Sequence, residues 1–117
     1  MSSTVTGGCQ CGVVRFEAEA DLGRTMQCNC SICQNKGLIL TFAPREQFRL
    51  LSGEDRLAEY RFNKHAIAHR FCAVCGVQPF AYATSPDGKA MAAINVRCVD
   101  GVDLETLTPQ WFDRRSL

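Results

Sequence analysis

The 117-residue sequence lacks the features that mark membrane proteins, nucleic-acid-binding proteins and secreted proteins. None of its apolar runs approaches the roughly 20 residues of a membrane span. The net charge is only +1, and lysine and arginine form no basic block, so we expect no nucleic-acid partner. Residues 1–8 lack the basic stretch followed by an apolar stretch that builds a secretion signal. We therefore expect no membrane partner and a cytoplasmic location.

Low-complexity segments, linkers and internal repeats are also missing from the sequence. Hydrophobic residues make up 46% of the chain, which argues against disorder. The length fits a single domain over residues 1–117. A chain of this size has room for a hydrophobic core but still gains from a metal that ties its loops together.

No window of a dozen residues has the periodicity of an amphipathic helix, and short strand patterns take its place. Residues 13–20 alternate, with Phe16 and Ala18 on one face and Arg15 and Glu17 on the other. Many short strands with glycine and proline turns predict an all-β fold. The other expected strands are residues 38–42, 48–51, 57–62, 66–71, 77–84 and 91–99.

The turns between these strands suggest how they pair. Residues 48–51 and 57–62 flank a Ser-Gly-Glu-Asp turn, which predicts a hairpin. Residues 66–71 and 77–84 flank a pair of cysteines in the same way. One helical turn is expected over residues 44–47, and the aromatic pair at residues 111–112 is expected to fold back onto the core.

Eight cysteines are a high number for a chain of this length. They fit either a disulfide framework or metal ligation. Without a secretion signal the thiols are expected to stay reduced. Most of them also lie in Cys-x-Cys and Cys-x-x-Cys pairs, which place two sulfurs on one short turn. Spacing and compartment together favour metal.

Two of these pairs predict a closed four-cysteine zinc site. Cys9 and Cys11 form the first pair, Cys72 and Cys75 the second, and glycine stands beside each pair. Glycine permits the positive φ angles of such turns and lets backbone N–H groups approach the sulfurs. Four thiolates leave zinc no open position, so the site is expected to be structural. The alternative is that these are buried free cysteines.

A further group has three cysteines instead of four: Cys28, Cys30 and Cys33. Three protein ligands plus one exchangeable position is the arrangement of a catalytic zinc. With three thiolates the formal charge is +2 − 3 = −1, which makes the ion a poor Lewis acid. Such an ion suits a substrate thiol held as thiolate, so reactions at sulfur are favoured over hydrolysis.

Other interpretations of this group stay open at the level of sequence. A fourth ligand from His65, His69 or Cys98 would close the site. Cys30 and Cys33 could instead cycle as a redox dithiol, although the sequence shows no thioredoxin-like βαβ context. The three cysteines could also be unligated core residues.

With these motifs in place, the chain resembles the family of glutathione-dependent formaldehyde-activating enzymes, which includes centromere-protein-V-like proteins. Many members have histidine at the position of Asn29, inside the second motif. The matching segments occur in the expected order and are Gly8-Cys9-Gln10-Cys11-Gly12, Cys28-Asn29-Cys30-Ser31-Ile32-Cys33, Phe71-Cys72-Ala73-Val74-Cys75-Gly76 and Ile94-Asn95-Val96-Arg97-Cys98.

The resemblance implies a β-tent fold of several small antiparallel sheets stapled by zinc, with two zinc ions per chain. It implies a structural zinc on Cys9, Cys11, Cys72 and Cys75, and a catalytic, more weakly held zinc on Cys28, Cys30 and Cys33. It further implies carbon–sulfur lyase chemistry, in which formaldehyde condenses reversibly with the thiol of glutathione to S-hydroxymethylglutathione. The alternative is a zinc-stapled binding module without catalysis.

Overall fold

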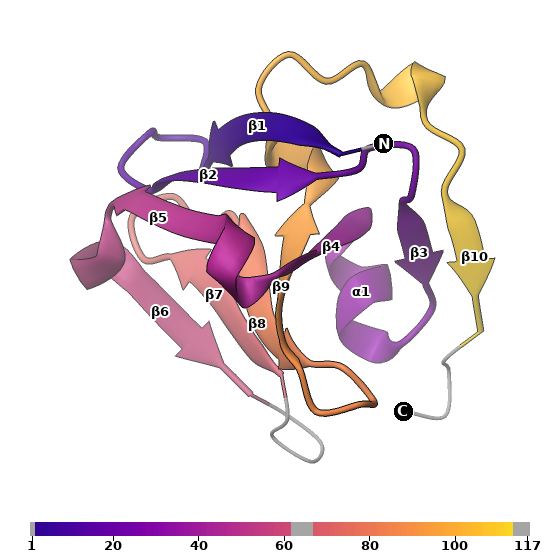
Figure 1. Ribbon diagram of the computed structural model, residues 1–117. Coiled ribbons are helices and arrows are strands. Elements are labelled where there is room, and N and C mark those ends of the chain that lie inside the picture. Colours follow the sequence, from indigo (N-terminus) through magenta and orange to yellow (C-terminus); the bar gives the residue numbers. More distant parts are fainter. Residues whose placement is uncertain (1, 62–66, 114–117) are drawn as a thin grey trace.

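The computed structural model describes residues 2–61 and 67–113, and strands dominate this part of the chain (Figure 1). Its single α-helix is α1 (Ser31–Lys36), and four 3₁₀ turns connect strands at Arg45–Gln47, Glu54–Arg56, Val96–Cys98 and Leu104–Thr106. The strands are β1 (Ser3–Gly8), β2 (Arg15–Ala20), β3 (Met26–Cys28), β4 (Leu40–Pro44), β5 (Phe48–Ser52), β6 (Leu57–Tyr60), β7 (Ala68–Cys72), β8 (Phe80–Thr84), β9 (Ala90–Asn95) and β10 (Gln110–Phe112).

The described strands form two sheets. A three-stranded antiparallel sheet has the order β1-β2-β5, and a seven-stranded sheet has the order β10-β3-β4-β9-β8-β7-β6. All neighbours in the larger sheet are antiparallel except β10 and β3, which run parallel. The three-stranded sheet lies across one face of the larger sheet (Figure 1). This arrangement confirms the expected all-β, β-tent class.

The core between the sheets is built on three phenylalanine rings. Phe16 of β2 is fully buried, as its alternating strand predicts. Its ring lies 5.4 Å from that of Phe48 and 6.4 Å from that of Phe80, measured between ring centroids. Phe48 and Phe80 are 4.7 Å apart. The three rings come from β2, β5 and β8, so they join both sheets in one aromatic cluster.

The opposite face of the seven-stranded sheet packs on α1. Opposed residues of antiparallel strands point to the same face, so Ala81 and Ala93, which pair across β8 and β9, face the same way. Both are buried together with Leu38 and Cys33 of the α1 region. Phe80 and Ala81, as neighbours on one strand, therefore serve two separate cores.

Two local predictions were wrong. The hairpin expected of residues 48–51 and 57–62, of which residue 62 lies outside the described residues, does not form, because β5 pairs with β2 in the small sheet and β6 pairs with β7 in the large one. The strand expected over residues 91–99 ends at Asn95, where the chain turns into a 3₁₀ helix. By contrast, the hairpin of β7 and β8 around the cysteine turn is confirmed.

The helix α1 was not expected, because its six residues are too few for a periodic pattern. Only Cys33 among them is buried, and Gly37 ends the helix in the left-handed conformation, with φ 66°. At the carboxyl end of the described chain, Phe112 packs on this core as predicted, whereas Trp111 is 60% exposed.

No helix among the described residues combines the length and the apolar character that a membrane crossing requires.

Truncation of Phe16 tests the aromatic core. We expect Phe16→Ala to lower the free energy of unfolding by about 3–5 kcal/mol, because it opens a cavity between two sheets. Phe42→Ala is the matched control, since Phe42 is already 43% exposed, and it should cost about 1 kcal/mol or less. Urea denaturation measures both values. Equal losses for the two variants would contradict the assignment of the core.

Candidate metal centres

Four cysteines converge where the ends of the two sheets meet. Cys9 follows β1 and Cys11 lies in the turn toward β2, whereas Cys72 ends β7 and Cys75 lies in the turn toward β8. Their four sulfurs all lie within 4.8 Å of one another. The sulfurs of Cys9 and Cys11 are 3.5 Å apart, and those of Cys11 and Cys72 are 3.7 Å apart. We refer to this group as the four-cysteine cluster.

The backbone around the four-cysteine cluster directs N–H groups toward the sulfurs. Gly12 and Gly76, which follow the two cysteine pairs, have φ angles of 84° and 82°, a conformation that glycine adopts without strain. The turns thus formed aim N–H groups at the sulfurs. Val14 donates to the sulfur of Cys9 over 3.3 Å, and Val74 donates to that of Cys72 over 3.3 Å.

These hydrogen bonds make the thiols unequal in acidity. The N–H of Val77 lowers the pKa of Cys75 to about 6. The N–H of Val13 also acts on Cys11, but burial and the neighbouring sulfurs outweigh it and raise the pKa of Cys11 to about 11. The backbone N–H groups therefore favour the thiolate form of Cys75, and a cation at the centre would stabilise that form further.

The four-cysteine cluster fits a tetrahedral metal ion. Zinc bonded to four sulfurs at about 2.3 Å would set sulfur–sulfur separations of roughly 3.8 Å. The measured separations of 3.5 and 3.7 Å are close to that value. The sulfurs are soft ligands of the kind that zinc prefers, and the N–H groups around them offset their negative charge.

A second group of three sulfurs lies on the other face of the large sheet. Cys28 ends β3, Cys30 caps the amino end of α1, and Cys33 lies in its first turn. These sulfurs lie within 4.8 Å of one another, and those of Cys28 and Cys30 are 3.4 Å apart. In the described part of the chain no fourth cysteine, histidine or carboxylate joins them. We refer to them as the three-cysteine cluster.

The helix α1 controls the acidity of the three-cysteine cluster. Burial raises the pKa of Cys30, but the N–H groups of Cys33 and Ile32 and the neighbouring thiols lower this pKa by more than burial raises it, so the net pKa is reduced. Burial raises the pKa of the Cys33 thiol. A thiolate at a helix amino end is a common way to build a nucleophilic or metal-binding sulfur.

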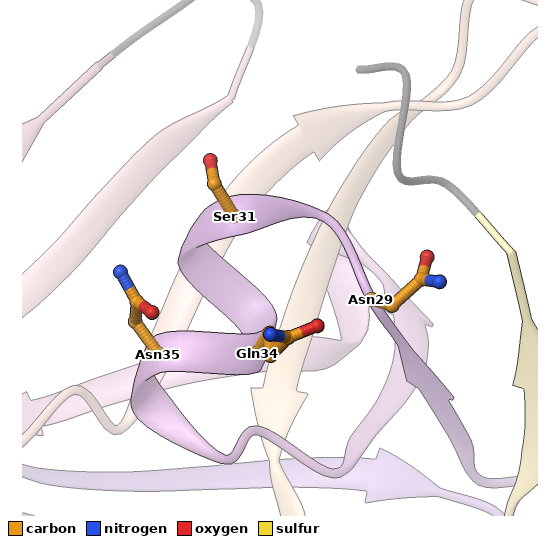
Figure 2. Close-up of a pocket in the computed structure, with 4 residues that line it drawn as sticks. All are labelled: Asn29, Ser31, Gln34 and Asn35. Carbon is orange, nitrogen blue, oxygen red and sulfur yellow. The ribbon is translucent and has the colours of Figure 1, made fainter.

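An open pocket of about 480 Å³ lies over the segment that carries the three-cysteine cluster. Figure 2 shows its lining side chains around α1. The cysteines of the segment are only 6–9% exposed, so they face the core while the polar residues between them face the pocket. The lining consists of three amides and one hydroxyl, from Asn29, Ser31, Gln34 and Asn35.

Asn29 connects the pocket to the carboxyl end of the described chain. Its side-chain amide donates to the carboxylate of Asp113 over 2.9 Å. The amide is 6% exposed and stands between Cys28 and Cys30. Asp113 follows Phe112, whose strand β10 runs parallel to β3. The parallel pairing of β10 therefore brings a carboxylate next to the three-cysteine segment.

The structure brings none of the other described ligand candidates into either cluster. His69 is buried on β7 and bonds Gln78 through its Nδ1, and the sulfur of Cys98 faces the backbone oxygen of Gln78 at 3.7 Å. Burial raises the pKa of Cys98 to about 11. His65 lies outside the described residues.

The pocket lining and the position of Asp113 were not predicted from the sequence. Ser31, Gln34 and Asn35 gave a weak signal, since they are polar residues in or directly after the cysteine motif, on a segment that proved helical. Asp113 gave none, because its place depends on the pairing of β10 with β3.

Metal titration tests both clusters. We expect the chain to bind two divalent ions, because two separate sets of sulfurs lie at metal-binding distances. Cobalt(II) reports this through its thiolate absorption bands. A Cys33→Ser variant should retain one ion, and the control Cys98→Ser should retain two. A wild-type chain that saturates at one ion would contradict the three-cysteine site.

Comparisons with known proteins cover nearly the whole chain. A crystal structure of a Rhodobacter sphaeroides protein superposes with a TM-score of 0.82 and 26% sequence identity, over 92% of this chain and 99% of that chain. The model of the family described as "Glutathione-dependent formaldehyde-activating enzyme" matches residues 4–113. This match spans both cysteine clusters and all of the described sheet residues except Ser3, and the chain therefore belongs to the glutathione-dependent formaldehyde-activating enzyme family.

Proposed function

We propose that this protein is a zinc-dependent carbon–sulfur lyase that forms or cleaves an S-hydroxymethyl adduct of glutathione or of a related small thiol. The observation that supports this most directly is the three-cysteine cluster, whose sulfurs converge without a fourth described ligand beneath a polar pocket. Membership of a glutathione-dependent family supports a thiol as the partner.

The two clusters would have different duties. Zinc on the four-cysteine cluster would have no open position, so its role would be to hold the two sheets together. Zinc on Cys28, Cys30 and Cys33 would leave one position for a ligand. When bound there, zinc supplies a site at which a thiol ligand is held as thiolate near neutral pH.

The chain's own residues would bind and orient the thiol compound. The amides of Asn29, Gln34 and Asn35 and the hydroxyl of Ser31 offer both donors and acceptors, which suit the amide groups of a peptide-like thiol. Held in this pocket, the thiol and the aldehyde would react as neighbours and not as separate molecules in solution.

The reaction transfers one proton overall, from the hydroxyl oxygen of the adduct to the sulfur of the thiol. Cleavage converts R–S–CH₂–OH into R–SH and formaldehyde, so the hydroxyl proton leaves as the carbon–sulfur bond breaks. Asn29 cannot take this proton, because an amide does not titrate. Water in the open pocket is the acceptor, and the carboxylate of Asp113 holds the Asn29 side chain in place beside it.

One observation favours the alternative, a zinc-stapled binding module without catalysis. The cysteines of the three-cysteine cluster are 6–9% exposed and share a core with Leu38, Ala81 and Ala93. A module of this kind would hold metal without exchanging a ligand.

Loss of one sulfur from the four-cysteine cluster should prevent folding. Zinc binding is worth about 10–16 kcal/mol in small zinc domains, comparable with the whole stability of a domain. We expect Cys72→Ser to be insoluble or unfolded, and the control Cys98→Ser to be soluble and cooperative in a thermal melt. A soluble Cys72→Ser protein with an unchanged melting temperature would show that the cluster is not structural.

The lyase proposal is tested by exchange kinetics between formaldehyde and glutathione, at several thiol concentrations. We expect wild type and Cys98→Ala to accelerate exchange above the uncatalysed rate, and Cys30→Ala to match the blank because it removes a ligand of the open site. The enzyme-free control is essential, since this reaction is fast by itself.

Two outcomes separate the competing functions. If wild type and Cys30→Ala both match the blank, formaldehyde is not the substrate. If small thiols also leave the cobalt spectrum of the three-cysteine cluster unchanged, the site has no exchangeable position. The protein is then a zinc-stapled binding module without catalysis.

A further inference from the structure

Gln78 lies between the two cysteine clusters and contacts elements from both. It is 4% exposed and follows Val77, whose carbonyl accepts from the N–H of Cys72 over 2.9 Å. Its side chain reaches in the other direction, to α1, where Lys36 donates to its Oε1 over 2.6 Å. Gln78 thus joins the turn of the four-cysteine cluster to the helix that carries Cys33.

The hydrogen bonds of Gln78 have a fixed direction. Lys36 has donors only, so the oxygen of the Gln78 amide must face it. The Gln78 nitrogen then donates to Nδ1 of His69 over 3.1 Å. His69 is therefore neutral, with its proton on Nε2. Burial lowers the pKa of His69, and the positive charge of Lys36 lowers it further, in agreement with this assignment.

The backbone of Gln78 is held as firmly as its side chain. Its carbonyl accepts from the side-chain amide of Asn95 over 2.9 Å. The oxygen of the same Asn95 side chain accepts from the N–H of Arg97, and the guanidinium of Arg97 donates to the carbonyl of Gly37 over 2.8 Å. A second set of contacts thus leads from Gln78 to the carboxyl end of α1.

The helix needs such contacts because apolar packing holds it weakly. α1 has six residues, of which only Cys33 is buried. A helix this short is marginal without tertiary support. Its amino end carries the sulfurs of Cys30 and Cys33, so any shift of the helix changes the geometry of the three-cysteine cluster.

We propose that Gln78 is a positioning residue: it ties α1 to the turn of the four-cysteine cluster and thereby raises the affinity of the three-cysteine cluster for metal. This inference rests on the proposed metal site at Cys28, Cys30 and Cys33. An ordered turn at residues 72–76 fixes the position of Gln78. Gln78 in turn fixes the position of α1 through its hydrogen bond with Lys36. Outer contacts that orient metal ligands typically change metal affinity 10–100-fold.

The test uses Gln78→Met and Lys36→Met, which keep the length of the side chains and remove the hydrogen bond between them. Gln47→Met and Lys89→Met are matched controls on exposed positions. Cobalt(II) is titrated in competition with a chelator. We expect the weaker binding step to lose 10–100-fold in affinity in both test variants, and the stronger step to stay within twofold of wild type. The controls should leave both steps unchanged.

The double variant tests whether Lys36 and Gln78 act through the same hydrogen bond. If Lys36 acts through Gln78, Lys36→Met combined with Gln78→Met loses no more affinity than Gln78→Met alone. Losses that multiply would show independent effects and overturn the proposal. Equal weakening of both metal steps would also overturn it, because Gln78 would then support the fold in general.

Amide hydrogen exchange gives a readout that needs no metal at the three-cysteine cluster. The N–H of Gln34 donates to the backbone carbonyl of Cys30 over 2.9 Å, and that of Leu38 donates to the backbone carbonyl of Cys33 over 3.1 Å, so both report on α1. We expect both to exchange faster in Gln78→Met, and unchanged exchange would refute the role of Gln78. If wild type binds no second ion, the proposed lyase site fails, and this measurement still decides whether Gln78 holds the helix.

Discussion

The convergence of four cysteine sulfurs at the meeting point of two sheets is the constraint on which the rest of the structure depends. Two sulfurs come from the β1–β2 turn of the small sheet, and two come from the β7–β8 turn of the large one. Thiolates at these distances repel one another unless a cation or shared protons lie between them. The cluster therefore fixes one edge of the contact between the sheets, and the Phe16, Phe48 and Phe80 rings fill the space beside it.

The seven-stranded sheet allows a small chain to carry two different sulfur sites. One of its faces packs on the small sheet and bears Cys72, and the other packs on α1 and bears Ala81 and Ala93. Because successive residues of a strand point to opposite faces, the two cores beside these sites share strands β8 and β9 without sharing side chains. One site lies between two sheets, whereas the other lies under a short helix with a polar pocket over it. We propose a structural duty for the first site and ligand exchange for the second.

Polar contacts link the two sites because α1 has little apolar surface to bury. A helix with one buried residue gains little from hydrophobic packing. Hydrogen bonds from Lys36 and Arg97 hold its carboxyl end, and both bond networks pass through the segment that follows the cysteine turn. Gln78 and Asn95, the central members of these networks, are buried. Hydrogen bonds of buried polar groups help to specify one arrangement of the elements that they join.

The sequence by itself determined the all-β class, the strand β2 with its buried Phe16, the β7–β8 hairpin and the grouping of seven cysteines into sets of four and three. These features are local, because alternation and Cys-x-Cys spacing act over a few residues. Only the tertiary structure decided that β5 and β6 belong to different sheets, since a turn signal does not reveal a competing partner such as β2. It alone also placed Asp113 and Gln78 beside the cysteine segments. Their contacts join residues 42 and 84 positions apart in the chain, and such contacts depend on which strands pair, which no local pattern encodes.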